Sequence, residues 1–294
     1  LTRVAVAEKY CEKHGIRCEL RTVPSAPTGM QMLLAGDLEV QMGPPEVVFN
    51  AAARGAKIKV AGTFHGTPMT FLMASSKLAT PNEASGYPAV MRDLKGKKVG
   101  VTARGAGTEF QLGSLLKGAG MTPADVTIVA VGSPDTALGA LRSGQVDAVM
   151  LFEPMGGFCE VQRICRVLVD PRKGQGPHDL TGITGASTLQ TVRADYAQKN
   201  PQVIVKLEAA LLDAERFIQT PANRPAVLKV LRDTFSISVP DSDVVLNVVL
   251  RDSISAFTAR LDPKALQFGA DTMLSNGQID RAIDVSTLLL SDAK

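Results

Sequence analysis

The residues best suited to chemistry lie in a glycine-containing loop at 102–108, with the sequence Thr-Ala-Arg-Gly-Ala-Gly-Thr. The loop follows a strand-like run at 97–101 and precedes a helical pattern at 109–118. Gly105 and Gly107 let the backbone approach a bound molecule, and N–H groups at a helix N-terminus bind anions. Arg104 could add a bidentate contact to a carboxylate or sulfonate. The loop predicts an anion site, although a plain strand–helix turn with Arg104 in water would fit the same sequence.

Other candidate residues follow further predicted strands, because ligands of open parallel sheets bind beyond the carboxyl ends of the strands. Two roles suit His65 equally well: a contact to the ligand, or a hinge residue whose ring bonds to the backbone. We interpret Glu153 as a structural acid at a strand end rather than as a ligand contact. Glu109 is interpreted as solvated or as capping the helix. The predicted ligand-binding residues are Ser25, Pro27, Thr28, Gly43, Pro44, Phe64, His65, Arg104, Gly105, Ala106, Gly107, Thr108, Ser133, Phe152 and Glu153.

This set of residues offers many hydrogen-bond donors and few carboxylates. It predicts a small anion or polar organic acid rather than a cation or a sugar. Phe64, Pro44 and Phe152 could pack against an organic body, which favours a sulfonate or carboxylate with an apolar part over bare nitrate.

The sequence shows no pattern of an enzyme or a metal site, and we predict no catalytic residue, cofactor or metal. The three His residues are scattered, with no His-x-x-x-His, and no Gly-x-Ser-x-Gly occurs. Residues 179–187 loosely resemble a phosphoribosyl-diphosphate loop but lack its paired acids.

The four cysteines form two close pairs, Cys11 with Cys18 and Cys159 with Cys165. Each pair spans the end of a predicted helix and the start of the next strand, a geometry that can bring two Cα atoms within disulfide range. Buried thiols and local disulfides both fit this pattern, and a metal or catalytic role fits it less well. We predict that each pair lies close enough to bridge, whether or not the bond is present.

Length and composition indicate a globular chain with room for two domains. A hydrophobic content of 45% and a charged content of 21% are ordinary, and no apolar run reaches the ~18 residues of a membrane span. A scattered net charge of +3 argues against a nucleic-acid surface. With no Trp, a stacking platform for sugars is not expected. Segments 80–87 and 170–177 are predicted to be exposed loops.

Two stretches, 28–42 and 136–150, align without a gap, and each consists of a short helical pattern, a glycine and an aliphatic run. Such a repeat predicts two lobes with a cleft between them. The second copy is preceded by a strand and loop at 97–108 that the first copy lacks. Either the two halves differ here, or a first strand, its loop and a signal peptide stand before residue 1. We favour the second interpretation, and we expect that 1–13 form a helix leaving a sheet with an open or foreign-filled strand position.

Apolar runs alternate with helical patterns up to about residue 189, which predicts an α/β fold with mostly parallel strands. After residue 200 only helical patterns follow, and Pro201 stands at a helix start. We predict that the first lobe comprises 1–78 and 188–294, that the second comprises 79–187, and that the chain crosses near Ala74 and Ser187. The predicted strands are 17–23, 39–42, 58–63, 70–75, 97–101, 126–131, 148–152, 166–169 and 183–191.

Several motifs, in order, resemble the nitrate/sulfonate/taurine-type (NitT/TauT) substrate-binding proteins of ABC importers. They include Leu34-Ala-Gly-Asp-Leu-Glu39, Asp93-Leu-Lys-Gly-Lys-Lys-Val-Gly-Val101 and Ala140-Leu-Arg-Ser-Gly-Gln-Val-Asp-Ala-Val149, and the similarity covers nearly the whole chain. The resemblance implies a two-lobed type II periplasmic-binding fold whose lobes close on a ligand. It also implies a monomeric periplasmic receptor that delivers its ligand to an ABC transporter permease. The alternative is a small-molecule-processing enzyme or an effector-sensing domain on the same fold.

Overall fold

The computed structural model describes residues 1–235, 237, 239 and 241–290, and the chain forms two compact units. Unit 1 comprises Leu1–Thr67, Ile183–Ser236 and Ser253–Lys294, and unit 2 comprises Pro68–Gly182 and Ile237–Asp252. The chain therefore passes between the units four times. The crossings after residues 236 and 252 were not anticipated from the sequence.

Unit 1 contains a three-stranded sheet in the order β1 (Val40–Gly43), β8 (Thr188–Arg193), β2 (Ile58–His65). Strand β8 runs antiparallel to both neighbours, so β1 and β2 point the same way. Helices α3 (Ala26–Ala35), α4 (Pro45–Ala53) and α13 (Pro263–Ser275) supply most of the main core of the unit, which includes Leu33, Phe49, Leu189 and Leu266. A smaller cluster joins Val192 to α9 (Ala194–Lys199) and α10 (Pro201–Gln219).

The N-terminal segment packs on α10 instead of joining the sheet. It forms two short helices, α1 (Thr2–Ala7) and α2 (Tyr10–Lys13), and β1 is the edge strand beyond which no further strand pairs within the described residues. Asp213 of α10 accepts hydrogen bonds from Lys13 Nζ at 2.8 Å and His14 Nε2 at 2.9 Å. The predicted strand at 17–23 is wrong: this segment lies outside both sheets, and Leu20 is 43% exposed.

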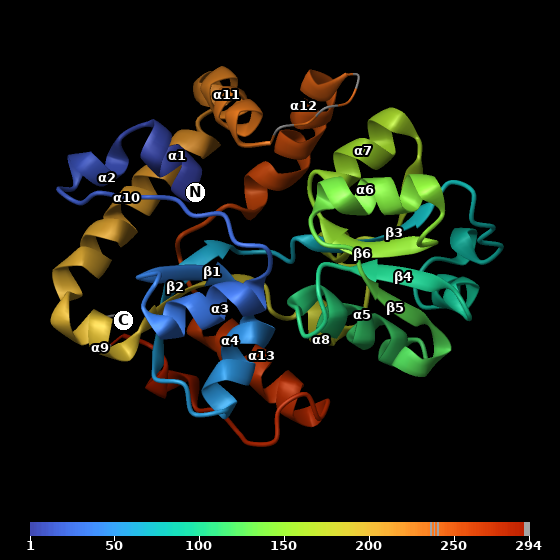
Figure 1. Cartoon of the computed structure of the whole chain (residues 1–294), viewed down its shortest axis with the longest axis horizontal. Helices are drawn as coiled ribbons and strands as arrows, with labels where there is room; N and C mark the ends of the chain where they lie inside the picture. The colour runs from blue at the N-terminus through green and yellow to red at the C-terminus, as the bar shows by residue number, and fades with distance from the viewer. Residues whose placement is uncertain (236, 238, 240, 291–294) are drawn as a thin grey trace. The chain divides into compact units, whose positions relative to one another are not determined.

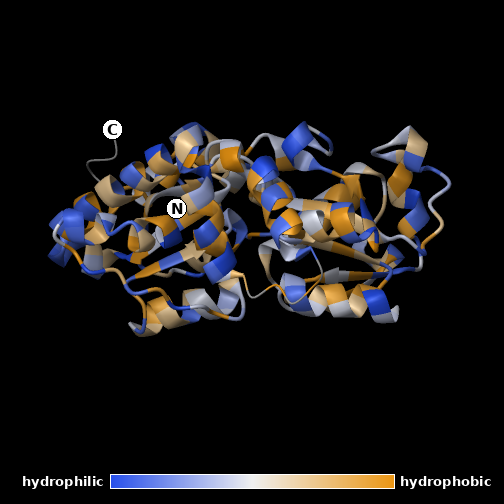
Figure 2. Cartoon of the chain, turned by 90° about the horizontal axis from the view of Figure 1, so that it is seen from above, coloured by the Kyte–Doolittle hydropathy of each residue, from blue (hydrophilic) through white to orange (hydrophobic). Residues whose placement is uncertain are grey.

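Unit 2 contains a five-stranded sheet in the order β5 (Thr127–Ala130), β4 (Lys98–Val101), β6 (Ala148–Phe152), β3 (Thr70–Ser75), β7 (Cys165–Val169). One apolar cluster includes residues of α6 (Pro134–Ser143), α7 (Met155–Gln162) and α12 (Ser242–Ser253), and another includes residues of α5 (Gly107–Gly118) and α8 (His178–Thr181). Figure 1 shows α6 and α7 on one face of this sheet and α5 on the other. In Figure 2 the strands are mainly hydrophobic, whereas the helices alternate between hydrophobic and hydrophilic residues.

The remaining described helix is α11 (Arg224–Thr234), and short 3₁₀ turns connect the larger elements. These turns are η1 (Glu83–Ser85), η2 (Ala89–Leu94), η3 (Pro123–Asp125), η4 (Pro171–Lys173), η5 (Pro221–Asn223), η6 (Ile254–Ala256) and η7 (Val285–Thr287).

The α/β class is confirmed, but neither sheet is mostly parallel, since both strand pairs of unit 1 are antiparallel and the sheet of unit 2 is mixed. In unit 2, β4 is parallel to β5 and β6, whereas β3 is antiparallel to β6 and β7. Both β3 and β8 follow a crossing from the other unit, at 67/68 and 182/183. A strand that arrives in this way has no helical crossover before it, and such a crossover is what makes neighbouring strands parallel.

The internal repeat appears as α3–β1 in unit 1 and α6–β6 in unit 2. Each helix ends at a glycine in the left-handed conformation, Gly36 with φ 93° and Gly144 with φ 74°. Because side chains disfavour this conformation, the two glycines stop both helices at the same place.

Both cysteine pairs are bonded, so the prediction that each pair can bridge is confirmed and the free-thiol alternative is wrong. The Cα atoms of Cys11 and Cys18 lie 5.9 Å apart, and those of Cys159 and Cys165 lie 4.5 Å apart.

Helix α12 lies in unit 2, whereas the sequence assigned its residues to the first lobe. Val245 and Val249 are buried in the same cluster as Phe158 of α7. The contact is close at Gly157, where an added Cβ would lie 2.9 Å from Val245 Cγ1 and 3.0 Å from Val249 Cγ2. A local helical pattern cannot reveal which distant helix it packs against, so this assignment needed the tertiary contact.

We predict that Gly157→Ala lowers the free energy of unfolding by about 1–2 kcal/mol, because the methyl group overpacks the α7–α12 contact. The matched control is Gly139→Ala in α6, where an added Cβ meets nothing within 4 Å. That change should stabilise the protein by about 0.5–1 kcal/mol through helix propensity. Urea unfolding followed by circular dichroism compares the two, and equal effects would contradict the close contact.

Candidate anion-binding site

The loop between β4 and α5 places the predicted anion-binding residues at the start of a helix. Gly105 has φ 72°, a left-handed turn that suits glycine, and α5 begins at Gly107. The N-cap residue is Ala106, which has no side-chain oxygen to cap the helix. Within the described part of the chain, the N–H groups of Gly107 and Thr108 have no hydrogen-bond acceptor. These are the free donors that attract anions to helix N-termini.

Side chains of the same loop bond to one another. Thr108 Oγ1 accepts the N–H of Thr102 at 3.0 Å and lies 2.9 Å from Thr102 Oγ1. Glu109 Oε2 accepts the N–H of Gly105 at 2.6 Å, and its Oε1 lies 2.9 Å from Arg104 Nη2. The Arg104 side chain is 65% exposed, so its guanidinium is paired at the surface.

The neighbouring strand ends bring Ser133, Phe152 and Glu153 to the same edge of the sheet. Strands β5, β4 and β6 are parallel, so the segments after them share one edge. Ser133 is the N-cap of α6 and makes no side-chain capping bond. Phe152 is 37% exposed at the end of β6, where it can meet the apolar part of a ligand.

Glu153 is buried and bonded within unit 2, as the structural interpretation that the sequence favoured would expect. Its Oε1 accepts from Arg172 Nη1 at 2.9 Å, and its Oε2 accepts the N–H of Gly157 in α7 at 3.1 Å. Burial raises the pKa of the Glu153 carboxyl, while the Arg172 guanidinium opposes that rise.

Arg172 is the centre of a buried ion cluster that sequence reasoning missed. Its Nε and Nη2 donate to Asp170 at 2.8 and 2.9 Å, and its guanidinium carbon lies 4.1 Å from the ring centroid of Phe71 in β3. Asp170 is 2% exposed, so the prediction of an exposed loop at 170–177 is wrong at its start. The available signal was the acid–arginine spacing directly after an apolar run.

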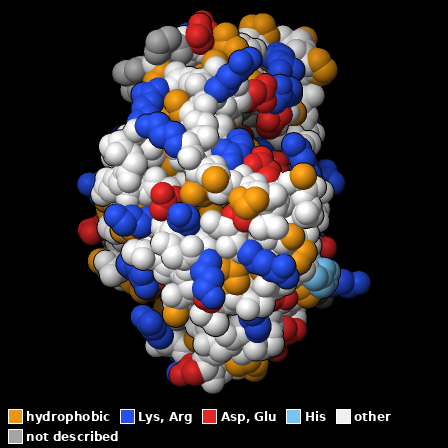
Figure 3. Space-filling view, turned by 90° about the vertical axis from the view of Figure 1, so that its right-hand side faces the viewer, with side chains coloured by type: hydrophobic (Ala, Val, Ile, Leu, Met, Phe, Trp, Pro, Cys, Tyr) orange, Lys and Arg blue, Asp and Glu red, His pale blue; other side chains and the backbone are white. Residues whose placement is uncertain are grey.

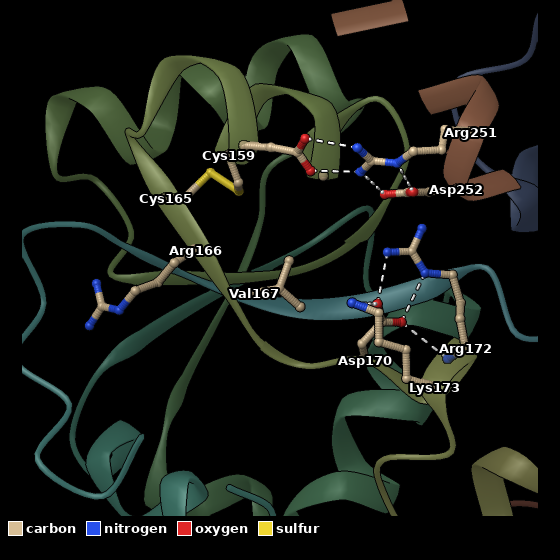
Figure 4. A pocket seen from close by; sticks show the side chains of 11 residues that line it. Cys159, Cys165, Arg166, Val167, Asp170, Arg172, Lys173, Arg251 and Asp252 are labelled. Atoms are coloured by element: carbon tan, nitrogen blue, oxygen red, sulfur yellow. Dashed lines mark hydrogen bonds and ion pairs between the residues drawn. A yellow bond between two sulfur atoms is a disulfide. The ribbon is translucent and has the colours of Figure 1, made fainter. Parts of the chain in front are cut away.

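Unit 2 contains a pocket of about 290 Å³ lined by α7, β7, the η4 turn and the end of α12. Figure 4 shows Arg251 beside Asp252 and Arg172 beside Asp170, with the Cys159–Cys165 disulfide away from both pairs. Arg251 donates to Glu160 at 3.0 and 2.7 Å. None of the predicted ligand-binding residues lines this pocket, and its arginines are bonded to carboxylates. We therefore interpret the pocket as part of the contact between α7 and α12, which the Arg251–Glu160 ion pair joins.

In unit 1 the predicted residues lie at the starts of α3 and α4 and at the end of β2. Ser25 is the N-cap of α3 and accepts the N–H of Thr28 at 3.3 Å, and Pro27 lies in the first turn. Gly43 ends β1 and Pro44 is the N-cap of α4.

Phe64 and His65 lie at the end of β2, and both side chains pack within unit 1. Phe64 is 2% exposed and belongs to the interior. His65 Nδ1 lies 3.0 Å from Thr188 Oγ1, and its ring centroid is 5.1 Å from that of Phe257. Burial lowers the pKa of His65 to about 3, so the ring is neutral near pH 7.

Figure 3 shows one face of the molecule, on which Lys and Arg side chains are interleaved with acidic and hydrophobic ones. Among the described residues, no three His, Cys, Asp or Glu side chains are grouped as a metal site. None of the described helices combines the length and apolar character that crossing a membrane requires.

Comparison with known proteins identifies similar sequences and folds. The model of the NMT1-like family matches residues 2–232. A binding protein of Brucella abortus is 29% identical over 217 residues, and the taurine-binding periplasmic protein of Escherichia coli is 26% identical over 225 residues. Each match covers 74% of this chain but only 62% and 63% of the relative, so the chain spans less than two thirds of these proteins.

Solved structures share the fold over almost the whole chain. The alkanesulfonate-binding protein of Xanthomonas axonopodis pv. citri, bound to MOPS, superposes with a TM-score of 0.79 at 20% identity and covers 99% of this chain and 94% of its own. The nitrate-binding protein of Synechocystis PCC 6803 gives 0.72 at 13% identity and covers 98% and 81%. These likenesses confirm the periplasmic-binding fold that the sequence predicted.

We predict that Arg172→Ala lowers the free energy of unfolding by about 3–5 kcal/mol, because it leaves the buried Glu153 and Asp170 carboxylates without their cation. Arg104→Ala is the matched control, since it breaks an exposed ion pair and should cost less than about 1 kcal/mol. Urea unfolding at pH 7 gives both values, and similar losses would show that the buried cluster has no special role.

We also predict that His65 makes stability depend on pH in the acid range. The ordinary pKa of His is about 6.5, and the folded value is about 3, so the unfolded chain takes up the proton first. The stabilising contribution is complete above pH 6.5 and is lost as the pH falls toward 3. Between pH 7 and 4 the wild type should therefore lose more stability than His65→Asn. Urea unfolding at three pH values tests this, and parallel curves would refute it.

Proposed function

Because the chain belongs to the NMT1-like family, we propose that it is the solute-binding component of an ABC importer and takes up a small organic anion. The fold is that of binding proteins for alkanesulfonate and nitrate, and a similar sequence binds taurine. We propose a monomer outside the cytoplasm that delivers its ligand to a membrane permease. The two bonded cysteine pairs support this location, since disulfides persist in oxidising compartments.

The observation that carries the proposal is the open N-terminus of α5. The N–H groups of Gly107 and Thr108 are free of acceptors in the described chain, and the helix dipole adds positive potential there. A carboxylate or sulfonate oxygen can accept both. The neighbouring N-terminus of α6 at Ser133 is likewise without a side-chain cap.

An exposed aromatic ring at the same edge supports a ligand with an apolar part. Phe152 ends β6, which is parallel to β4, the strand that leads into the anion loop. We propose that a sulfonate or carboxylate head binds the α5 amides and that its organic body packs on this ring. In unit 1 we propose Ser25, Thr28 and Pro44 as further contacts, because they also lie at helix starts that follow a strand or loop.

A thermal-shift screen tests this function. We expect alkanesulfonates and aliphatic or aromatic carboxylates to raise the melting temperature, whereas polyamines and sugars leave it unchanged. A ligand at ~100 times its dissociation constant stabilises the fold by about 2.7 kcal/mol, which is a measurable shift. A shift with cations or sugars alone would contradict the anion site.

The control for the site is a pair of variants at the first residue of α5. Proline is tolerated at this position and lacks the N–H group, so Gly107→Pro removes one donor, whereas Gly107→Ala keeps it. A hydrogen bond to a charged group is worth about 1.5–3 kcal/mol, so the proline variant should bind the best anion about 10- to 150-fold more weakly. Equal affinities of the two variants would place the anion elsewhere.

A further inference from the structure

The first turn of α5 carries a carboxylate that is already bonded to the proposed anion loop. Glu109 Oε2 accepts the N–H of Gly105 at 2.6 Å, and Oε1 lies 2.9 Å from Arg104 Nη2. The Glu109 side chain is only 18% exposed, so this arrangement is held within the fold. The one guanidinium of the loop is therefore neutralised by the same helix whose free amides would bind the ligand.

The other loops at this edge of the sheet supply no unpaired guanidinium. Arg172 is bonded to Glu153 and Asp170, and Lys173 Nζ lies 3.8 Å from Asp170 Oδ2. The segments 102–109, 132–136, 152–155 and 170–173 contain three cationic and four acidic side chains, a formal charge of −1. The cationic residues are Arg104, Arg172 and Lys173, and the acidic ones are Glu109, Asp135, Glu153 and Asp170.

With this balance of charges, the loop should bind singly charged ligands more strongly than doubly charged ones. The amides of Gly107 and Thr108 are neutral donors, and they can hold one negative charge without a cation. A second charge on the same ligand head would lie near the Glu109 carboxylate and find no unpaired guanidinium to offset the repulsion. At such short range, repulsion between like charges weakens binding by at least about tenfold.

We propose that Glu109 is a specificity-determining residue, whose carboxylate makes the α5 loop accept singly charged anions and reject doubly charged ones. The inference rests on the proposed function, because it concerns the same loop. It selects sulfonates and carboxylates with one charge over inorganic sulfate and doubly charged phosphate monoesters, and it does so by repulsion rather than by an added contact.

The test compares butane-1-sulfonate with butyl phosphate by isothermal titration calorimetry at pH 5.5 and pH 8. The sulfonate has one charge at both pH values, whereas the second pKa of a phosphate ester is about 6, so it gains its second charge between them. The wild type should bind butyl phosphate at least about tenfold more weakly at pH 8 than at pH 5.5, and the sulfonate about equally at both. In Glu109→Gln, whose amide oxygen can still accept the Gly105 N–H, the difference for butyl phosphate should fall below about threefold.

Asp241→Asn is the matched control, because it removes one exposed carboxylate of unit 2 outside these loops. It should behave as the wild type. A tenfold difference that persists in Glu109→Gln, while the sulfonate binds, would overturn the inference and leave the proposed function standing. If neither probe binds the wild type, the inference is overturned, and if no anion shifts the melting temperature in the thermal screen, the proposed function fails with it.

Discussion

The hydrogen bonds of two strands, β3 and β8, are the interactions on which both sheets depend. Strand β8 is the central strand of unit 1 and alone connects β1 with β2, while β3 alone connects β7 with the rest of the sheet in unit 2. Each of these strands follows a crossing from the other unit. Buried backbone N–H and C=O groups need partners, so neither sheet is complete until distant segments of the chain have met.

The pairing of β3 also positions the residues of the candidate site in unit 2. Strand β3 holds β6 on one side and β7 on the other, and the ends of β6 and β7 carry Glu153 and Asp170. Arg172 bonds to both carboxylates and lies against Phe71 of β3 itself. The buried ion cluster thus joins the segments that follow β6 and β7, at the same edge of the sheet as the starts of α5 and α6.

The helix N-termini differ in whether the protein already satisfies their amides, and this difference is why we propose the α5 loop for the charged head of the ligand. In α3 the Ser25 side chain accepts the N–H of Thr28, and in α7 the Glu153 carboxylate accepts that of Gly157. In α5 the cap is Ala106, so the first amides have no internal acceptor among the described residues. The Glu109 carboxylate bonds to the same loop, and this contact is the basis of the selectivity that we propose.

The sequence by itself determined the features that depend on neighbouring residues: the repeat with its two helix-ending glycines, the strand–loop–helix at 97–118, the two bridging cysteine pairs and the start of α10 at Pro201. Strand periodicity, left-handed glycine and helix capping are local properties, so a linear pattern records them. Only the tertiary structure decided that 17–23 stays outside the sheets, that β3 and β8 run antiparallel to their neighbours, and that α12 packs on α7. It also decided that Glu153 and Asp170 share Arg172. Such contacts depend on distances between residues far apart in the chain, and no local spacing encodes which of several suitable partners a side chain or strand will reach.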